Sequence, residues 1–304
     1  MITDATNPSN LDQAGLSRPP RRLSRWQSRR LQQRTASILS HILLILGSII
    51  MIVPFVWMLS TSFKAPGKTF VYPPEWIPDP VVWQNYPNMW TALPFNNFFL
   101  NSVKIAGLST LGQLLTCAMA AFAFSVLKFK GRDVLFLLLI ATLMIPHQVT
   151  LIPTFILFSK IGWVGTHLPL WVPAFWGGAF GTFLLRQFFL TIPIDLAESA
   201  RMDGASIFRI FTSIYLPLSM PALATLGIFT FMWTWNNLLD PLIYVSKLKQ
   251  LTLTVGLSFF QNQYGGKWTL MMEGAVVSIL PILIIFFLAQ KYFIQGIAMT
   301  GIKR

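Results

Sequence analysis

Long apolar stretches constrain this sequence more than any other feature. A helix needs about 20 apolar residues to cross the hydrocarbon of a bilayer. Stretches of that length cover residues 38–59, 98–126, 134–158, 170–190, 218–245 and 269–293. Only 11% of the residues are charged, whereas soluble domains carry roughly 25%. The sequence therefore predicts an all-α integral membrane protein with six transmembrane helices.

Prolines lie inside or close to several of these stretches, namely Pro54, Pro146, Pro153 and Pro281. Membrane bundles tolerate proline because neighbouring groups satisfy the carbonyls that it leaves unpaired. We therefore predict spans that are kinked rather than straight.

The distribution of basic residues predicts the orientation. Six spans place both termini on one side, and lysine and arginine accumulate in cytoplasmic segments. With the N-terminus inside, the cytoplasmic set is Arg18, Arg21, Arg22, Arg25, Arg29, Arg30, Arg34, Lys128, Lys130, Arg132, Arg201, Arg209, Lys291, Lys303 and Arg304. The smaller external set is Lys64, Lys68, Lys160, Lys247, Lys249 and Lys267. We expect a multi-pass protein of a bacterial-type cytoplasmic (inner) membrane with both termini in the cytoplasm.

The N-terminal residues 1–37 form a basic tail ahead of the first span. A net charge of +13 raises nucleic acid as a partner, but arginines beside a span face anionic lipid instead. We expect this tail to be disordered, to remain uncleaved and to contact membrane lipid, with no nucleic-acid partner. Residues 38–295 then form the transmembrane domain, and residues 296–304 a cytoplasmic C-terminal tail.

The segment 60–97 is the largest external connection. Pro73, Pro74, Pro78 and Pro80 exclude a transmembrane helix there, because each proline removes a backbone donor and clashes with the preceding turn. Its tryptophans, Trp76, Trp83 and Trp90, suit either a docking surface or an aromatic belt at the membrane interface.

The cytoplasmic segment 192–217, between the fourth and fifth spans, predicts a helix–turn–helix. Asp195 and Glu198 have the spacing of a helix cap and its reciprocal partner. Gly204 suits a left-handed turn that ends the first helix, and Ser206 can cap a second one. Pro217 marks the entry into the fifth span. An amphipathic element of this kind is suited to contact another protein.

This segment resembles the EAA loop of ABC-importer permeases. The resemblance rests on Glu198-Ser-Ala, Gly204 and Ile214-Tyr-Leu-Pro217 at the spacing of that motif, with Ser199 where the family usually has alanine. In the family this loop forms a coupling helix that docks on the ATPase subunit. The resemblance implies ATPase-coupling residues Asp195, Glu198, Ser199, Ala200, Arg201, Asp203, Gly204, Ile214, Leu216 and Pro217.

Further motifs place the resemblance in the carbohydrate branch, near the second, six-helix permease of maltose-type importers. They begin at Asn101, Met144, Phe183, Trp233 and Gln290. The resemblance implies a second related permease, two ATPase subunits and an external solute-binding protein as partners, with a sugar as substrate. It also implies that this chain binds no cofactor, that ATP and Mg belong to the ATPase subunits, and that residues 301–304 approach those subunits.

Polar residues within spans are costly and therefore informative. Amides and aromatic faces are the groups that bind sugar hydroxyls and rings, and the fifth span offers Trp233, Trp235, Asn236 and Asn237. These residues either line a solute pathway or join helices by hydrogen bonds. Cys117, in the second span, is interpreted as a small helix-packing residue.

Other chemistry has little support in the sequence. His41, His147 and His167 lie far apart, so we predict no metal site. Pro66-Gly67-Lys68-Thr69 lacks the earlier glycine of a phosphate loop, because Ser62 stands at that position. No catalytic constellation indicates an enzyme. An ion-driven secondary transporter is the alternative function; it favours internal repeats and acidic residues at the membrane centre, for which Asp240 and Glu273 are the candidates.

Overall fold

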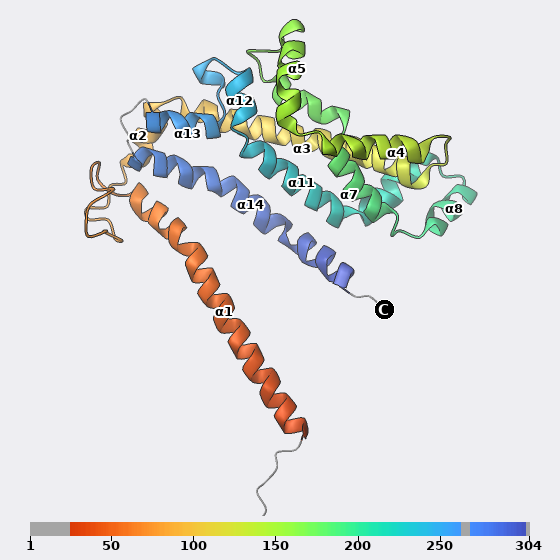
Figure 1. Ribbon diagram of the computed structural model, residues 1–304, viewed down its shortest axis with the longest axis horizontal. Helices are drawn as coiled ribbons and strands as arrows, with labels where there is room; N and C mark the ends of the chain where they lie inside the picture. Colours follow the sequence, from red (N-terminus) through yellow and green to blue (C-terminus); the bar gives the residue numbers. More distant parts are fainter. Residues whose placement is uncertain (1–24, 263–267, 302–304) are drawn as a thin grey trace, which may run out of the picture. The chain divides into compact units, whose positions relative to one another are not determined.

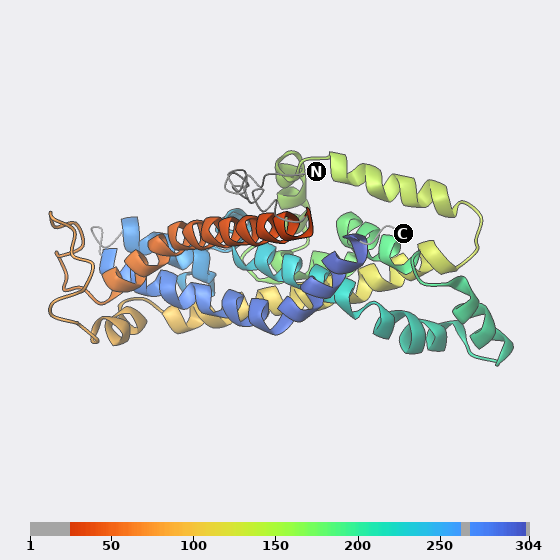
Figure 2. The same ribbon diagram turned by 90° about the horizontal axis from the view of Figure 1, so that it is seen from below.

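The computed structural model describes residues 25–262 and 268–301 (Figures 1 and 2). Every regular element in these residues is a helix, which confirms the all-α prediction for this part of the chain. The chain divides into two compact units, Met1–Val56 and Trp57–Arg304.

The first unit consists, in its described part, of most of helix α1 (Arg25–Ser62). Residues Gln33–Ser62 are long and apolar enough to cross a membrane, and all side chains from residue 33 to 56 are exposed. The hydroxyls of Ser40 and Ser48 donate to carbonyls one turn earlier, so these polar groups are satisfied within the helix. The helix begins ahead of the predicted start at residue 38, and residues 1–24 of the predicted tail lie outside the described residues.

The second unit contains the remaining helices. They are α2 (Asn85–Ala92), α3 (Phe95–Val126), α4 (Arg132–Ala141), η1 (Thr142–Met144), α5 (His147–Lys160), α6 (Leu168–Trp171), η2 (Val172–Trp176), α7 (Ala179–Phe189), α8 (Ile194–Met202), α9 (Ile207–Ile210), the π-helical turn η3 (Phe211–Tyr215), α10 (Leu216–Leu218), α11 (Met220–Trp235), α12 (Leu239–Tyr244), η4 (Leu248–Gln250), α13 (Leu253–Asn262) and α14 (Trp268–Gly301).

Four of the described helical segments meet the length and hydropathy of a membrane span: Gln33–Ser62, Phe95–Val126, Leu168–Phe189 and Trp268–Lys291. Two further spans are present only if bent pairs are counted as one each. Arg132–Met144 and His147–Lys160 meet at 99°, and Ile207–Leu218 and Met220–Trp235 meet at 78°. The first bend lies at Pro146, where the fixed φ of proline and its missing N–H interrupt the helix. The structure is therefore consistent with four to six spans.

Helix α3 is the central element of the second unit, against which α7, α11 and η2 pack. Small residues allow the close approach. A Cβ placed on Gly112 would lie 2.6 Å from the ring of Phe175, and one on Gly181 would lie 2.7 Å from Cys117 Sγ. Cys117 is fully buried, so its interpretation as a helix-packing residue is confirmed.

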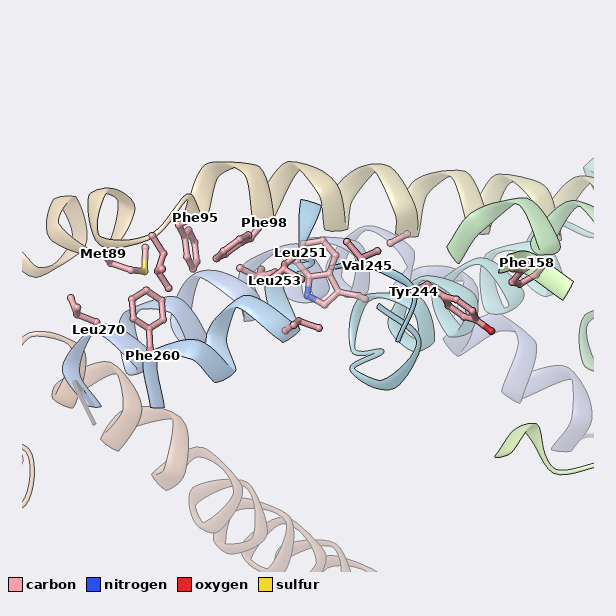
Figure 3. Packing of buried hydrophobic residues seen from close by; sticks show 14 residues of the cluster. Met89, Phe95, Phe98, Phe158, Tyr244, Val245, Leu251, Leu253, Phe260 and Leu270 are labelled. Carbon is pink, nitrogen blue, oxygen red and sulfur yellow. The ribbon is translucent and has the colours of Figure 1, made fainter. Parts of the chain in front are cut away.

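Two apolar clusters lie toward opposite ends of α3. The first, drawn in Figure 3, includes Phe95 and Phe98 from α3, Leu253 and Phe260 from α13, and Leu270 from α14. The second includes Phe122, Leu185 and Tyr215, from α3, α7 and η3. We refer to residues 60–93 and 246–262 as the α13 end, and to residues 127–132 and 192–217 as the α8 end.

The predicted fifth stretch, 218–245, is not one helix. Helix α11 ends at Trp235, and α12 begins at Leu239. The side chain of Asn237 accounts for the break, because its Oδ1 accepts a hydrogen bond from the backbone N–H of Asp240 at 3.2 Å. Asparagine competes in this way with the helical hydrogen-bond pattern. The prediction that the helix continues to residue 245 was therefore wrong.

Candidate functional site

The segment between α7 and α11 folds as a helix–turn–helix at the α8 end (Figure 2). Helix α8 ends in a left-handed turn at Gly204, which has φ +80°. The Ala205 N–H donates to the Ala200 carbonyl at 2.9 Å, and the Gly204 N–H donates to the Arg201 carbonyl at 3.0 Å. These two bonds form a complete Schellman cap. A left-handed residue with a β-carbon would be strained here, so glycine is required by the backbone.

The second helix of the segment is capped as predicted. Ser206 has extended backbone geometry and its Oγ accepts a hydrogen bond from the Arg209 N–H at 3.2 Å. The turn therefore carries two consecutive local signals, one that ends α8 and one that begins α9, and both are fixed by neighbouring residues.

The predicted cap of the first helix was wrong. Helix α8 begins at Ile194 with Pro193 at the cap position, and no side chain caps it. Proline already has a φ of −56°, which suits the start of a helix, so Asp195 lies within the first turn instead. There the carboxylate is favoured by the positive end of the helix dipole, without the reciprocal bond expected of Glu198.

The structure divides the predicted coupling residues into two groups. Ala200, Ile214 and Leu216 pack against the second apolar cluster, beside the buried Ala197 and Ile210. The remaining residues of the set are exposed: Asp195, Glu198, Ser199, Arg201, Asp203, Gly204 and Pro217. The apolar group fixes the segment to the bundle, and the exposed group forms its outer surface.

An aromatic anchor holds this segment against the bundle. Tyr215 is 1% exposed, and its ring lies edge-on to Phe122 of α3 and Phe189 of α7, with centroids 5.1 and 5.4 Å apart. Phe211 also contacts Phe122. Aromatic pairs in this geometry stabilise a contact by about 0.5–1.5 kcal/mol each beyond their buried area. The segment is thus tied to two helices of the bundle.

Sequence reasoning missed the apolar part of the outer surface. Met202 is 89% exposed and Phe208 is 72% exposed. Ile207, which precedes Phe208 in the chain, is 53% exposed. Large apolar side chains on the outside of an otherwise polar loop indicate contact with a partner. The signal was present in the sequence, because Met202 lies between the charged residues Arg201 and Asp203, and the apolar pair Ile207-Phe208 directly follows the Ser206 cap.

The predicted pathway residues occupy different surroundings. Trp233 is 77% exposed on α11, and Asn236 is exposed with its amide donating to the Met232 carbonyl. Asn237 donates to Asp240 Oδ2 at 2.7 Å. Trp235, in contrast, is 3% exposed and donates through its indole N–H to the Ser278 carbonyl at 3.1 Å, so it joins α11 to α14.

Comparison with known proteins places the chain among transport proteins. The family described as binding-protein-dependent transport system inner membrane component matches residues 115–299, which include the helix–turn–helix. An osmoprotective compounds uptake permease protein of Synechocystis sp. is 37% identical, over 72% of this chain and 74% of its own. An sn-glycerol-3-phosphate transport system permease protein of Yersinia pestis is 31% identical, over 87% and 97%.

A third relative and a solved structure extend the comparison. An alpha-glucoside transport system permease protein of Rhizobium meliloti is 36% identical, over 72% of this chain and 60% of its own. The fold matches a chain from the crystal structure of a bacterial ABC transporter involved in the import of alginate, with a TM-score of 0.76 and 23% identity, over 89% of this chain and 99% of that one.

Proposed function

Because this chain belongs to the family of inner membrane components of binding-protein-dependent transport systems, we propose that it is a permease subunit of an ABC importer. It pairs with a second related permease, two ATPase subunits and an external solute-binding protein. The chain has no ATPase site of its own, and the ATPase subunits bind ATP and Mg. The relatives give no support to the ion-driven carrier considered from the sequence.

The observation that carries this proposal is the helix–turn–helix of residues 192–217. Its backbone is fixed by the Schellman cap at Gly204 and the Ser206 cap, and its inner face is anchored through Tyr215. Met202 and Phe208 are exposed on the segment. A rigid element with an apolar outer surface can transmit a displacement, so we assign it to the ATPase contact, with Glu198, Arg201 and Asp203 at the rim.

The membrane topology in this proposal has six spans. The bent pair Arg132–Met144 and His147–Lys160 then counts as one span, because a break is tolerated at membrane depth where protein or a water-filled cavity surrounds it. The fifth span begins at Met220, after the cytoplasmic segment 192–217, and comprises α11 and α12. Both termini and the α8 end face the cytoplasm, in agreement with the positive-inside rule. The α13 end, with segments 60–97 and 246–267, faces outward and receives the binding protein; residues 263–267 of it lie outside the described residues.

The proposed substrate is a sugar or a sugar-like solute. The relatives are named for osmoprotective compounds, sn-glycerol-3-phosphate and alpha-glucoside. The last two names are chemically specific: sn-glycerol-3-phosphate is derived from a polyol, and an alpha-glucoside is a polyhydroxylated sugar derivative. ATP binding closes the ATPase pair, draws the coupling segments together and turns the permeases outward. The C-terminal residues 301–304 would approach the ATPase pair, and residues 302–304 of these lie outside the described residues.

The test is purification of the tagged chain in mild detergent, followed by mass spectrometry and an ATPase assay. We expect an ATPase and a second permease to co-purify, with ATPase activity in the eluate and ATP-dependent uptake after reconstitution with the binding protein. A chain that purifies alone and still transports after reconstitution contradicts the proposal.

A further inference from the structure

A polar cluster joins the break before α5 to the break between α11 and α12. His147 is the first residue of α5, directly after the bend at Pro146, and its Nε2 lies 3.0 Å from Oδ1 of Asp240 in α12. Asn237, in the break after α11, donates to Asp240 Oδ2 at 2.7 Å and accepts from the Asp240 N–H at 3.2 Å. Both carboxylate oxygens of Asp240 are therefore engaged, each by a residue at a helix break.

This cluster lies within the membrane-spanning part of the second unit. The indole N–H of Trp235 donates to the Ser278 carbonyl, and Ser278 lies near the centre of the candidate span Trp268–Lys291. At 1.5 Å per helical residue, Ser278 is about 15 Å below Trp268. Asn237 follows Trp235 by two residues. Helix α11 begins at Met220, beside the cytoplasmic segment, and rises about 24 Å to Trp235, so the break after α11, and with it the cluster, lies in the outer half of the membrane.

The cluster has an open side. The side chain of His147 is 55% exposed and that of Asp240 is 20% exposed. An ionisable pair facing lipid at this depth is costly, and such residues line a bundle interior or a water-filled path. The irregular backbone at both breaks must also be surrounded by protein or line a water-filled cavity. The open side of His147 consequently faces a solute pathway or another protein rather than lipid.

Asp240 determines which ring nitrogen of His147 is available. An ionised carboxylate only accepts hydrogen bonds, so Nε2 carries a proton and Nδ1 of the neutral ring keeps a lone pair. Within the described residues, Nδ1 has no hydrogen-bond partner. Its lone pair can accept a hydrogen bond from a hydroxyl group, and the exposed amide of Asn236 adds a second polar group beside the break.

We propose that His147, positioned by Asp240 and Asn237, is a solute-contact residue in the outer half of the membrane, and that with the Asp240 carboxylate beside it the site selects uncharged polyhydroxylated solutes over anions. This inference rests on the proposed function, and it names the substrate class of that pathway. The Asp240 carboxylate repels a phosphate or a carboxylate placed beside it, whereas the Nδ1 lone pair of His147 can accept a hydrogen bond from a sugar hydroxyl.

The competing explanation is that His147 only contacts the second permease. The two explanations differ in what a substitution changes. A lost solute contact lowers uptake while the assembled complex and its ATPase activity persist. A lost subunit contact lowers the amount of assembled complex, and ATPase activity falls with uptake.

The experiment uses the complete complex in proteoliposomes with its binding protein. The probes are radiolabelled maltose, sucrose, trehalose and glucosylglycerol as neutral solutes, and sn-glycerol 3-phosphate as the anion. The variants are His147→Leu and Asp240→Asn. The matched controls are His41→Leu, on the exposed face of α1, and Asp133→Asn, at the first turn of α4.

We expect wild-type uptake of a neutral probe and no uptake of the anion. His147→Leu and Asp240→Asn should lower neutral uptake by about two- to tenfold, the value of one hydrogen bond, with subunit yield and binding-protein-stimulated ATPase activity retained. The controls should transport normally. Unchanged uptake by both variants, a parallel loss of assembly, or selective uptake of the anion by the wild type overturns the inference but leaves the importer function intact. Assembled wild type without ATP-dependent uptake of any probe overturns both.

Discussion

The two ends of the second unit are held together by different kinds of interaction. At the α8 end, the helix–turn–helix is fixed by bonds between near neighbours, such as Ala205 N–H to Ala200 and Arg209 N–H to Ser206. At the α13 end, side chains clamp distant backbone. Asn101 donates to the carbonyls of Lys249 and Leu251 at 3.0 Å each. The α8 end is a preformed surface, whereas the α13 end depends on contacts across the fold.

This difference explains what a sequence can reveal. The turn at Gly204 and the Ser206 cap were predictable because their signals lie within a few residues of each other. The Asn101 clamp joins residues separated by 148 and 150 positions, and no local pattern indicates such a pair. The helix spans followed from hydropathy, since length and apolar composition alone decide that property.

The errors also have local physical causes. Residues 218–245 are apolar overall, so the averaged hydropathy concealed the break at Asn237, where one side chain bonds the backbone. Asp195 was assigned as a cap from its spacing to Glu198, although Pro193 supplies the preset φ that begins α8 two residues earlier. In both cases a specific side-chain or backbone preference prevailed over a general pattern.

The largest expected effect is a loss of affinity for the ATPase subunit when the outer surface of the helix–turn–helix is changed. The double substitution Met202→Ser and Phe208→Ser removes two exposed apolar side chains without disturbing the Schellman cap. Buried apolar anchors at interfaces contribute about 2 kcal/mol or more, so we expect affinity for the ATPase subunit to fall about 30-fold or more. Titration of purified ATPase onto the immobilised permease pair measures this change.

The matched control is Phe129→Ser, which removes an exposed aromatic residue at the same end but outside the segment. It should leave ATPase affinity unchanged. Equal losses in the control and the double variant would mean that the α8 end does not present a specific docking surface.

The next largest expected effect is on thermal stability, and it tests the hydrogen bonds from Asn101 at the α13 end. Asn101→Leu removes both donors to the 249–251 backbone and leaves two carbonyls without this partner. Leu251 is buried, and a buried polar group left unsatisfied costs about 1–3 kcal/mol, so we expect a lower melting temperature of the detergent-solubilised complex. Asn97→Leu, one turn earlier on the exposed side of α3, is the control and should have little effect. If the two variants melt alike, the clamp is not a significant source of stability.

The smallest expected effect is a dependence of thermal stability on pH, which arises from His167 at the same end. His167 Nε2 lies 2.7 Å from the Gln250 carbonyl, and Nδ1 lies 2.7 Å from Lys104 Nζ. Burial lowers the pKa of His167, the nearby Lys104 ammonium lowers it further, and the Gln250 carbonyl opposes both. Because the folded pKa lies below the unfolded value of about 6.5, the unfolded state binds more protons in this window.

Stability at this end should therefore be complete above about pH 6.5 and decline as the pH falls toward the lowered folded pKa. Thermal melts of the complex between pH 7.5 and 5.5 measure the decline, and His167→Asn should reduce its slope. A melting temperature that rises on acidification in the wild type but not in His167→Asn would show that the sign is wrong.

The most direct test of the coupling role compares two glycines. Gly204 and Gly131 both have left-handed backbones, with φ +80° and +82°, and neither has an atom within 4 Å of an added β-carbon. Valine at either position imposes similar backbone strain, but only Gly204 lies in the helix–turn–helix. The measurement is solute taken up per ATP hydrolysed by the reconstituted importer. We predict that Gly204→Val lowers this ratio at least tenfold, while Gly131→Val leaves it unchanged at equal abundance. Equal ratios for the two variants would contradict the assignment of residues 192–217 as the element that couples ATP hydrolysis to transport.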